Sequence, residues 1–564
     1  MRRRTRAISA LAGLALVTAA APATAAEGST SAATTVGDIT HVATIPFEGR
    51  GSDIEFASRE VVKLSGGATG EPVCEIDADG ACLVDDNGDT VWQTEVRDFA
   101  VVGVLEQPPR VVDITDPAKP VDVADVPCTA YQADVQIQGD VLLVAQDGGT
   151  GRCSLPGGGS QTFNGSAVLD FADPRNPAYL SRIQYARGSH NHTVHPTEPL
   201  VYLSDSDLAH ADGGNVPIWD VSDPANPRLV SEFKHLAHSP HDITFNADGS
   251  RAYAAAVSTT YILNTEDPRD PSVVATIANE GISISHQSDP TPDGKYLLVS
   301  DELGGGAAGV PPGGPVHVYD IRSEATPVKV GTIWPDCIPG SCQDPTAVPV
   351  STSHVFRINP DGFTMAIAWY KDGVGVIDYS GMRGSQAAGT GAATGLGPRA
   401  VAWTSEEITN SWAAKMWQDR HPGYLFATDV GALHVYYVAE LGPGFLGTGS
   451  LSGGNPAVYG AGIGVTQQEF ISECDYTPAS QGVDGWVAAI PPEHADGSTV
   501  LTARGSSAAG VYDLDLYFYD AECALLEAVE EEGDDETGVI PQDAAYVLVA
   551  SYVGGPTRVH LSVR

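Results

Sequence analysis

The sequence predicts an all-β protein, a seven-bladed β-propeller followed by a small β-sandwich of jelly-roll type. The main observation is a short repeat, in which an apolar β-branched run, an Asp-Pro-x-x-Pro turn and a second β run follow one another. It occurs at residues 110–126, 167–183, 217–233, 261–277 and, in diverged form, 316–333. Repeats that are roughly 45–60 residues apart and contain strands without helices are typical of propellers, which carry one copy per blade.

Each repeat predicts the two outer strands, C and D, of a four-stranded blade. Strand B is predicted upstream of each copy, and once more in the next blade, at 141–147, 200–205, 251–257, 295–302 and 364–370. The innermost strand A precedes strand B and starts near residues 133, 190, 241, 286 and 354. The first blade starts at 52–62 and carries an insertion at 64–95.

The last blade lacks its own outer strand. Its strands A, B and C are predicted within residues 411–438, and no D strand follows them. The segment ITHVATIPF at 39–47 resembles the D strands of the other repeats. We therefore predict that it closes the ring of residues 27–440 as the outer strand of the seventh blade, which removes the exposed sheet edges of an open ring.

The composition changes after the propeller. Residues 441–457 are rich in Gly, Pro and Ser and predict a linker. Residues 458–564 contain alternating segments at 512–520, 544–553 and 558–564, which predict a C-terminal β-sandwich.

The first 26 residues predict a signal peptide, because a basic start precedes a short apolar run and a small-residue exit. We expect a secreted, extracellular monomer with no membrane span. Removal of the signal leaves 26 Lys and Arg against 72 Asp and Glu, a formal charge of −46. This charge argues against nucleic acid and anionic membranes as partners.

Eight cysteines in an exported chain predict disulfide bonds. Eight cysteines allow 105 pairings. Their spacing favours four neighbouring pairs, namely Cys74–Cys82, Cys128–Cys153, Cys337–Cys342 and Cys474–Cys523.

The strongest functional signal is a histidine at one register of four consecutive blades. His241, His286 and His354 each stand seven residues before an Asp-Gly turn, and alignment of strand B places His190 at the same position. The start of strand A lines the mouth of the central channel, so these side chains face one another. Converging imidazoles suit a transition metal. The structural alternative is that each histidine only caps its strand.

Carboxylates at the ends of the B strands support the metal interpretation, because these ends lie on the same face. Glu302 is the best candidate for a ligand or base, and Asp205 is next. Copper, zinc, iron or manganese would fit a mixed His and carboxylate set. Acidic segments at 74–89 and at Asp513 and Asp515 are weaker candidates for calcium. The Asp-Pro aspartates Asp116, Asp173, Asp223 and Asp267 are expected to close turns.

The repeats resemble the LVIVD-repeat family of secreted or surface β-propellers, through RVVDITDPAKP, PIWDVSDPANP and the inner strand SDIEF. The C-terminal segments DLDLYFYD and AAYVLVASY resemble the bacterial pre-peptidase C-terminal domain, a β-sandwich appended to secreted enzymes. The first resemblance implies the fold, and the second implies an accessory module.

Three functions remain open from the sequence. The first is a platform that binds an extracellular protein, glycan or small molecule on its top face. The second is a metal-dependent oxidoreductase, similar in concept to selenium-binding-type methanethiol oxidases. The third is a metal lyase or dioxygenase with four histidines, which carotenoid-cleaving propellers resemble. The chain has no G-x-S-x-G, H-E-x-x-H, P-loop or Rossmann glycine pattern, so hydrolytic and nucleotide-dependent functions lack support.

Overall fold

The protein is all-β in its computed structural model, with a few short 3-10 turns such as η1 (Ser380–Met382), η3 (Ala439–Leu441) and η6 (Pro492–His494). The structure describes residues 35–564 except for gaps at 78, 207, 209–212, 279–281, 303–313, 334–351, 383–396, 452–470, 473–474, 477–483, 507–512, 531–532, 534 and 554–556. No helix in these described ranges is long and apolar enough to cross a membrane.

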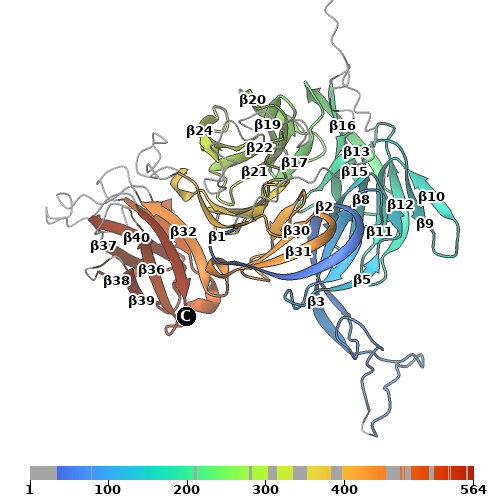
Figure 1. The fold of residues 1–564 in the computed structure, drawn as a ribbon, viewed down its shortest axis with the longest axis horizontal. Coiled ribbons are helices and arrows are strands. Elements are labelled where there is room, and N and C mark those ends of the chain that lie inside the picture. The colour runs from blue at the N-terminus through green and yellow to red at the C-terminus, as the bar shows by residue number, and fades with distance from the viewer. Residues whose placement is uncertain are drawn as a thin grey trace, which may run out of the picture. The chain divides into compact units, whose positions relative to one another are not determined.

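Three sheets are antiparallel meanders of four strands that follow one another in sequence (Figure 1). The first contains β13 (Ser189–Val194), β14 (Leu200–Asp205), β15 (Gly214–Asp220) and β16 (Arg228–Leu236). The second contains β17 (Asp242–Phe245), β18 (Arg251–Ala256), β19 (Thr259–Asn264) and β20 (Ser272–Ala278). The third contains β21 (Ser285–Pro290), β22 (Tyr296–Asp301), β23 (Val316–Asp320) and β24 (Val328–Ile333).

A fourth sheet of this kind contains a detour between its second and third strands. It consists of β7 (Gln132–Gln138), β8 (Val141–Gln146), β11 (Gly165–Asp170) and β12 (Ala178–Gln184). The detour contains β9 (Gly151–Ser154) and β10 (Ser160–Phe163), which form a separate three-stranded sheet with β6 (Cys128–Thr129), a strand that precedes β7. The sequence did not predict this small sheet, because its strands are short and polar.

Two larger sheets complete the repeat region. One contains β25 (Phe356–Ile358), β26 (Thr364–Ala368), β27 (Val374–Asp378) and β28 (Arg399–Thr404), with β1 (Thr35–Val36) added at its edge. The other has seven strands, in the order β29 (Ala414–Met416), β30 (Tyr424–Thr428), β31 (Val430–Val438), β2 (Ile39–Val62), β3 (Thr94–Val104), β4 (Arg110–Asp113) and β5 (Val121–Asp125). Meander sheets whose first strands lie side by side are the architecture of a β-propeller.

Strand β2 is long and pairs with a different strand along each of its two parts. Its first part pairs antiparallel with β31, from Ile39 opposite Val438 to Arg50 opposite Val430. Its second part pairs with β3, from Gly51 opposite Val104 to Val62 opposite Thr94. The predicted pairing of residues 39–47 with the strand at 432–438 is therefore present.

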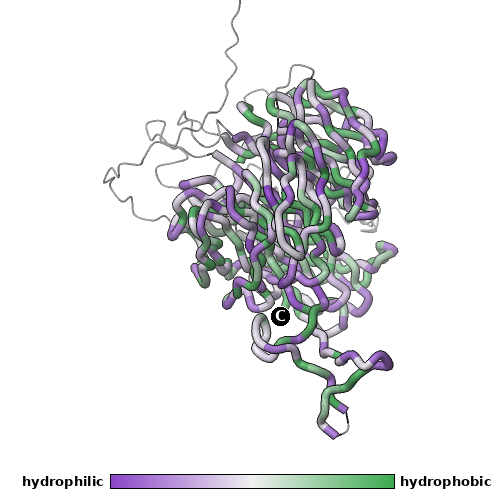
Figure 2. Tube along the Cα trace, turned by 90° about the vertical axis from the view of Figure 1, so that its right-hand side faces the viewer, coloured by the Kyte–Doolittle hydropathy of each residue, from purple (hydrophilic) through white to green (hydrophobic). Residues whose placement is uncertain are grey.

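Residues of neighbouring sheets share their cores, and this packing places the first strands next to one another. Leu200, Tyr202 and Ile218 of one sheet pack with residues of the next, Ala252, Ala254 and Leu263. Hydrophobic and hydrophilic residues are interspersed along the chain trace (Figure 2). The Asp-Pro turns join the outer strands as predicted, because Asp116, Asp173, Asp223 and Asp267 each accept the backbone N–H two residues ahead.

The C-terminal part contains two four-stranded sheets. One has the order β32 (Phe445–Leu451), β41 (Thr557–Val563), β36 (Val500–Ser506) and β39 (Asp535–Val539), and the other β35 (Asp484–Ala489), β40 (Tyr546–Val553), β37 (Asp513–Tyr519) and β38 (Leu525–Val529). Apolar residues of both sheets form one core. A two-stranded sheet pairs β33 (Ile471–Ser472) with β34 (Asp475–Tyr476). Strand β32 lies within the predicted linker, where its backbone pairs with β41 although its sequence is rich in glycine.

Two predicted disulfides are present, Cys74–Cys82 and Cys128–Cys153. Cys523 is also disulfide-bonded. Cys337, Cys342 and Cys474 lie outside the described residues. The first bridge lies in the insertion between β2 and β3, which projects away from the sheets in Figure 1.

Candidate metal centre

The four predicted histidines form a continuous row across four neighbouring sheets. His190 and His286 lie in the inner strands β13 and β21, and His241 and His354 lie just before the inner strands β17 and β25. The ring centroids of His190 and His241 are 4.0 Å apart, those of His241 and His286 4.2 Å, and those of His286 and His354 4.2 Å. The repeat therefore brings together side chains that are up to 164 residues apart in sequence, which is the distance from His190 to His354.

Glu302 faces three of these histidines from the end of β22. Its Oε2 atom lies 4.0 Å from Nε2 of His241 and 3.8 Å from Nε2 of His286, and its Oε1 atom lies 3.7 Å from Nε2 of His354. All three separations are longer than a hydrogen bond. They are close to the edge of about 3.4 Å that joins two ligands of a tetrahedral ion with bonds near 2.1 Å. His241, His286 and Glu302 thus form a buried group that could hold a metal ion.

Hydrogen bonds orient the outer two imidazoles. Nδ1 of His354 lies 2.6 Å from the carbonyl oxygen of Trp412, so it carries the hydrogen and leaves the Nε2 lone pair facing Glu302. Nδ1 of His190 lies 3.1 Å from Oδ2 of Asp147. A carbonyl or carboxylate behind a histidine is the usual arrangement around metal ligands, because it fixes the tautomer and the ring orientation.

The protonation states of the four histidines also favour the binding of a cation. Burial lowers the pKa values of His241 and His286 well below the ordinary value, and the neighbouring histidines lower them further. Burial lowers the pKa of His354 as well, against the opposing charge of Glu302. Burial would also lower the pKa of His190, but Asp147 outweighs it and raises that pKa. The inner imidazoles are therefore neutral at pH 7, the form in which histidine binds metals.

Asp205, the other carboxylate predicted as a ligand, lies in a different environment. Its Oδ2 atom is 2.7 Å from Nε of Arg187 and accepts a hydrogen bond from Tyr185 at 3.2 Å. It is not among the three residues that form the metal-holding group in the described chain. Its role as a ligand stays a prediction.

Two aromatic residues complete the site, and the sequence analysis assigned a role to neither of them. The hydroxyl of Tyr370 donates a hydrogen bond to Oε1 of Glu302. Burial and the charge of Glu302 raise the pKa of Tyr370 well above its ordinary value. Trp412 lies 5.4 Å from His354, centroid to centroid. Trp412 stands at the histidine register of the neighbouring strand set, beside His354. No sequence signal distinguishes Tyr370 from a core tyrosine.

A second cluster of charged residues lies on the inner strands and was also missed. Lys415 of β29 is 2.7 Å from Asp53 and 2.9 Å from Glu55, and Arg357 is 2.8 Å from Glu55. Burial would raise the pKa of Glu55, but the two cations outweigh it and lower the pKa to about 2. Burial and Asp289 raise the pKa of the nearby Asp242 to about 7. A positional pattern on strand A could have revealed this cluster, because its members stand one to three residues beyond the histidine register.

Other candidate residues have local structural partners. His195 contacts the carbonyl oxygen of Gly249 at 3.2 Å and accepts the backbone N–H of Glu198 at 3.1 Å. In the acidic insertion, Asp77 and Asp85 accept backbone N–H groups of their own loops. Asp513 accepts the N–H of Gly533. Calcium binding at these acidic segments stays a prediction.

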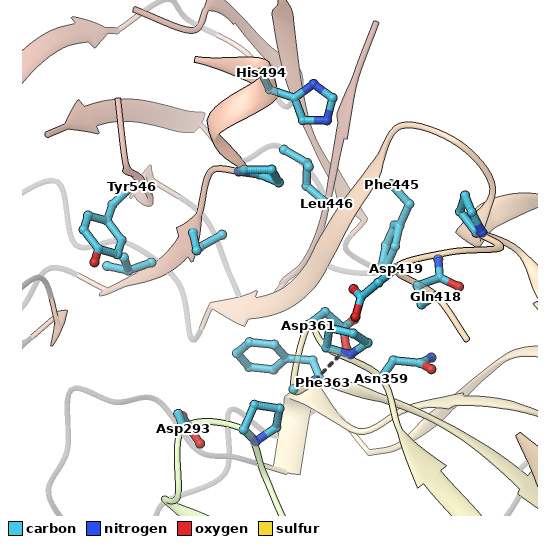
Figure 3. Close-up of a pocket in the computed structure, with 18 of the residues that line it drawn as sticks. Asp293, Asn359, Asp361, Phe363, Gln418, Asp419, Phe445, Leu446, His494 and Tyr546 are labelled. Atoms are coloured by element: carbon cyan, nitrogen blue, oxygen red, sulfur yellow. Dashed lines mark hydrogen bonds between the residues drawn. The ribbon is translucent and has the colours of Figure 1, made fainter. Parts of the chain in front are cut away.

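One cavity lies away from the histidine row and another lies beside it. One of about 660 Å³ is shown in Figure 3, where Asp361, Asp419, Phe363, Phe445 and His494 surround it. The carboxylate of Asp361 is engaged there by the N–H groups of Phe363 and Thr364. A second hollow of about 520 Å³ has Asp147, the partner of His190, in its wall.

Comparisons with known proteins give no family for this chain. The sequence matches no protein-family model and no curated protein. Among solved structures it is similar to the β-propeller domain of Cps50 (Swd1) from Myceliophteria thermophila, with a TM-score of 0.43, 11% identity, and coverage of 71% of this chain and 100% of that chain. It is also similar to a protein from Lactobacillus plantarum, with a TM-score of 0.41, 12% identity, and coverage of 59% and 84%.

A third similar structure is a putative 6-phosphogluconolactonase from Bacteroides uniformis, with a TM-score of 0.37, 15% identity, and coverage of 57% of this chain and 91% of that chain. Each of these TM-scores is below 0.5, so neither the fold nor an activity of this chain is inferred from these similarities. The fold and the site together define the class of this protein, a β-propeller with a buried His-His-Glu group that could hold a metal ion.

Proposed function

We propose that the protein is a secreted, seven-bladed propeller of the LVIVD-repeat type that binds a transition metal ion at the mouth of its channel. His241, His286 and Glu302 are the central ligands, with His354 and His190 beside them. The observation that supports this most is the geometry of Glu302, whose carboxylate has three imidazole nitrogens 3.7–4.0 Å away and a hydrogen bond to none of them. A cation is the group that fits between a carboxylate and neutral imidazoles at these separations.

The ring of this proposal has seven blades. Five come from the sheets that begin with β7, β13, β17, β21 and β25, and the seven-stranded sheet supplies two more that share β2. The two C-terminal sheets would form the β-sandwich, which resembles an accessory module. The signal peptide and the two disulfides fit an oxidising, extracellular location.

The donor set restricts the metal. Two or three imidazoles with one carboxylate suit zinc, iron, copper or manganese. A group with few protein ligands leaves positions for another molecule, which favours a metal-dependent oxidoreductase or lyase over a purely structural ion. Binding of a partner on the same face without chemistry is the second candidate function, because the hollow beside Asp147 opens near the row.

Metal content tests the proposal. Protein purified without a histidine tag should contain about one transition metal ion per chain by elemental analysis. The double variant His241→Ala/His286→Ala should lose that ion and keep its far-ultraviolet circular dichroism spectrum. His235→Ala/His238→Ala is the matched control, because it removes two histidines outside the row and should keep the metal. Metal retained in the first variant would contradict the proposal.

A further inference from the structure

Tyr370 occupies a constrained position behind Glu302. It follows strand β26 with a φ of 49°, in the left-handed region that non-glycine residues seldom adopt. Its side chain is 3% exposed and lies 4.8 Å from the ring of His354. Its carbonyl oxygen accepts the N–H of Ser411, which fixes the backbone on the far side. Such constrained residues are common where a side chain must be held in one place.

The two carboxylate oxygens of Glu302 have different neighbours. Oε1 accepts the hydrogen bond from Tyr370, while Oε2 faces Nε2 of His241 and His286. His354 faces Oε1, the oxygen that is already engaged. The carboxylate is therefore presented to the histidine pair through one oxygen.

We propose that Tyr370 is a positioning residue that keeps Glu302 a one-oxygen ligand, so that the bound ion retains an open position for a small anion. This inference rests on the proposed metal site. His241, His286 and one oxygen of Glu302 give three ligands, and three protein ligands with an open fourth position are typical of catalytic rather than structural zinc-type centres.

The charge of the site indicates the class of the fourth ligand. A divalent ion with one carboxylate and neutral imidazoles keeps a net charge of +1. A buried positive charge is costly unless it is neutralised. A monoanion at the open position removes it, whereas a cation or a bulky neutral molecule does not. The ligand is therefore a small anion that binds the ion directly.

Cobalt and azide test this inference. Cobalt(II) reports its coordination by visible absorption, and azide is a small anionic probe. In the cobalt-loaded full-length protein, azide should change the spectrum and saturate. Tyr370→Phe should still bind one cobalt ion, but its azide affinity should fall at least tenfold, because the freed Oε1 can bind the ion and fill the open position. Tyr370→Asn, which suits the left-handed backbone, should show the same loss.

Tyr436→Phe is the matched control. Tyr436 is 1% exposed and donates its hydroxyl to a carbonyl oxygen, that of Glu406, so its variant loses a buried phenol away from the site. It should bind azide like the unaltered protein. Absence of cobalt binding by the unaltered protein would contradict the proposed metal site itself. Cobalt binding without an azide response would overturn this inference while the metal site stands. The same holds if both Tyr370 variants bind azide as tightly as the unaltered protein does.

Discussion

At the scale of single residues, Lys415 is a buried charged residue of an inner strand whose charge is balanced by neighbouring carboxylates. Its ammonium group lies within 3 Å of two carboxylates, those of Asp53 and Glu55, and only 6% of the residue is exposed. Burial would lower the pKa of Lys415, but the two carboxylates outweigh it and raise that pKa. A buried ion pair that loses one partner leaves an uncompensated charge, which costs several kcal/mol.

We predict that Lys415→Met lowers the free energy of unfolding by about 3–5 kcal/mol at pH 7, because it leaves the buried Asp53 without its cation and Glu55 with Arg357 alone. Urea unfolding measures this change. The loss should shrink as the pH falls from about 4.5 toward 2, because the two cations outweigh burial and lower the pKa of Glu55 to about 2, and the stability that this shift supplies disappears over that range. Lys371→Met is the control, since Lys371 is exposed and its variant should stay within about 0.5 kcal/mol. Equal midpoints for both variants would contradict the role assigned to Lys415.

The histidine row could be predicted at this scale and Tyr370 could not. His190, His241, His286 and His354 occupy one register of a repeat, so their proximity follows from the architecture. Glu302 was also predicted, because it follows directly after a strand that ends on the same face. Tyr370 contacts Glu302 only because its backbone adopts a left-handed conformation, and no residue pattern encodes that turn. Asp205 was predicted as a second ligand, but it occupies the position of Asp301 rather than that of Glu302, since Asp205 pairs with Ser189 as Asp301 pairs with Ser285, and Arg187 lies beside it.

At the scale of elements, β2 joins the two ends of the repeat region. Its first part brings Val42, Ala43, Ile45 and Phe47 onto a core that contains Leu433 and Val435. The likeness of residues 39–47 to the D strands predicted this pairing, because register and hydrophobic pattern were the same. Strand β32 was not predicted, since a Gly-rich segment has no strand signal until a partner strand satisfies its backbone.

We predict that a protein that starts at residue 48 has a melting temperature at least about 5 °C below that of a protein that starts at residue 27. The shorter protein exposes the edge of β31 and the apolar residues that β2 covers. A protein that starts at residue 35 is the control, because it keeps β2, and it should melt like the longer one. Equal melting of all three would show that this strand does not close the ring.

At the scale of the whole molecule, the repeat explains both the fold and the site. Sheets that share cores place their first strands side by side, and one histidine per inner strand then becomes a row. The sequence carries a formal charge of −42, so the protein as a whole attracts cations. A ligand could not be predicted, because the loops between the strands differ in length and sequence from one repeat to the next.

The central claim is that one metal ion lies between His241, His286 and Glu302. The most direct test is anomalous diffraction from crystals grown with zinc, recorded on both sides of the zinc absorption edge. We predict one strong anomalous peak within about 2.0–2.3 Å of Nε2 of His241, Nε2 of His286 and Oε2 of Glu302. Crystals in excess zinc with no peak at this position, or with peaks only at surface carboxylates, would contradict the claim.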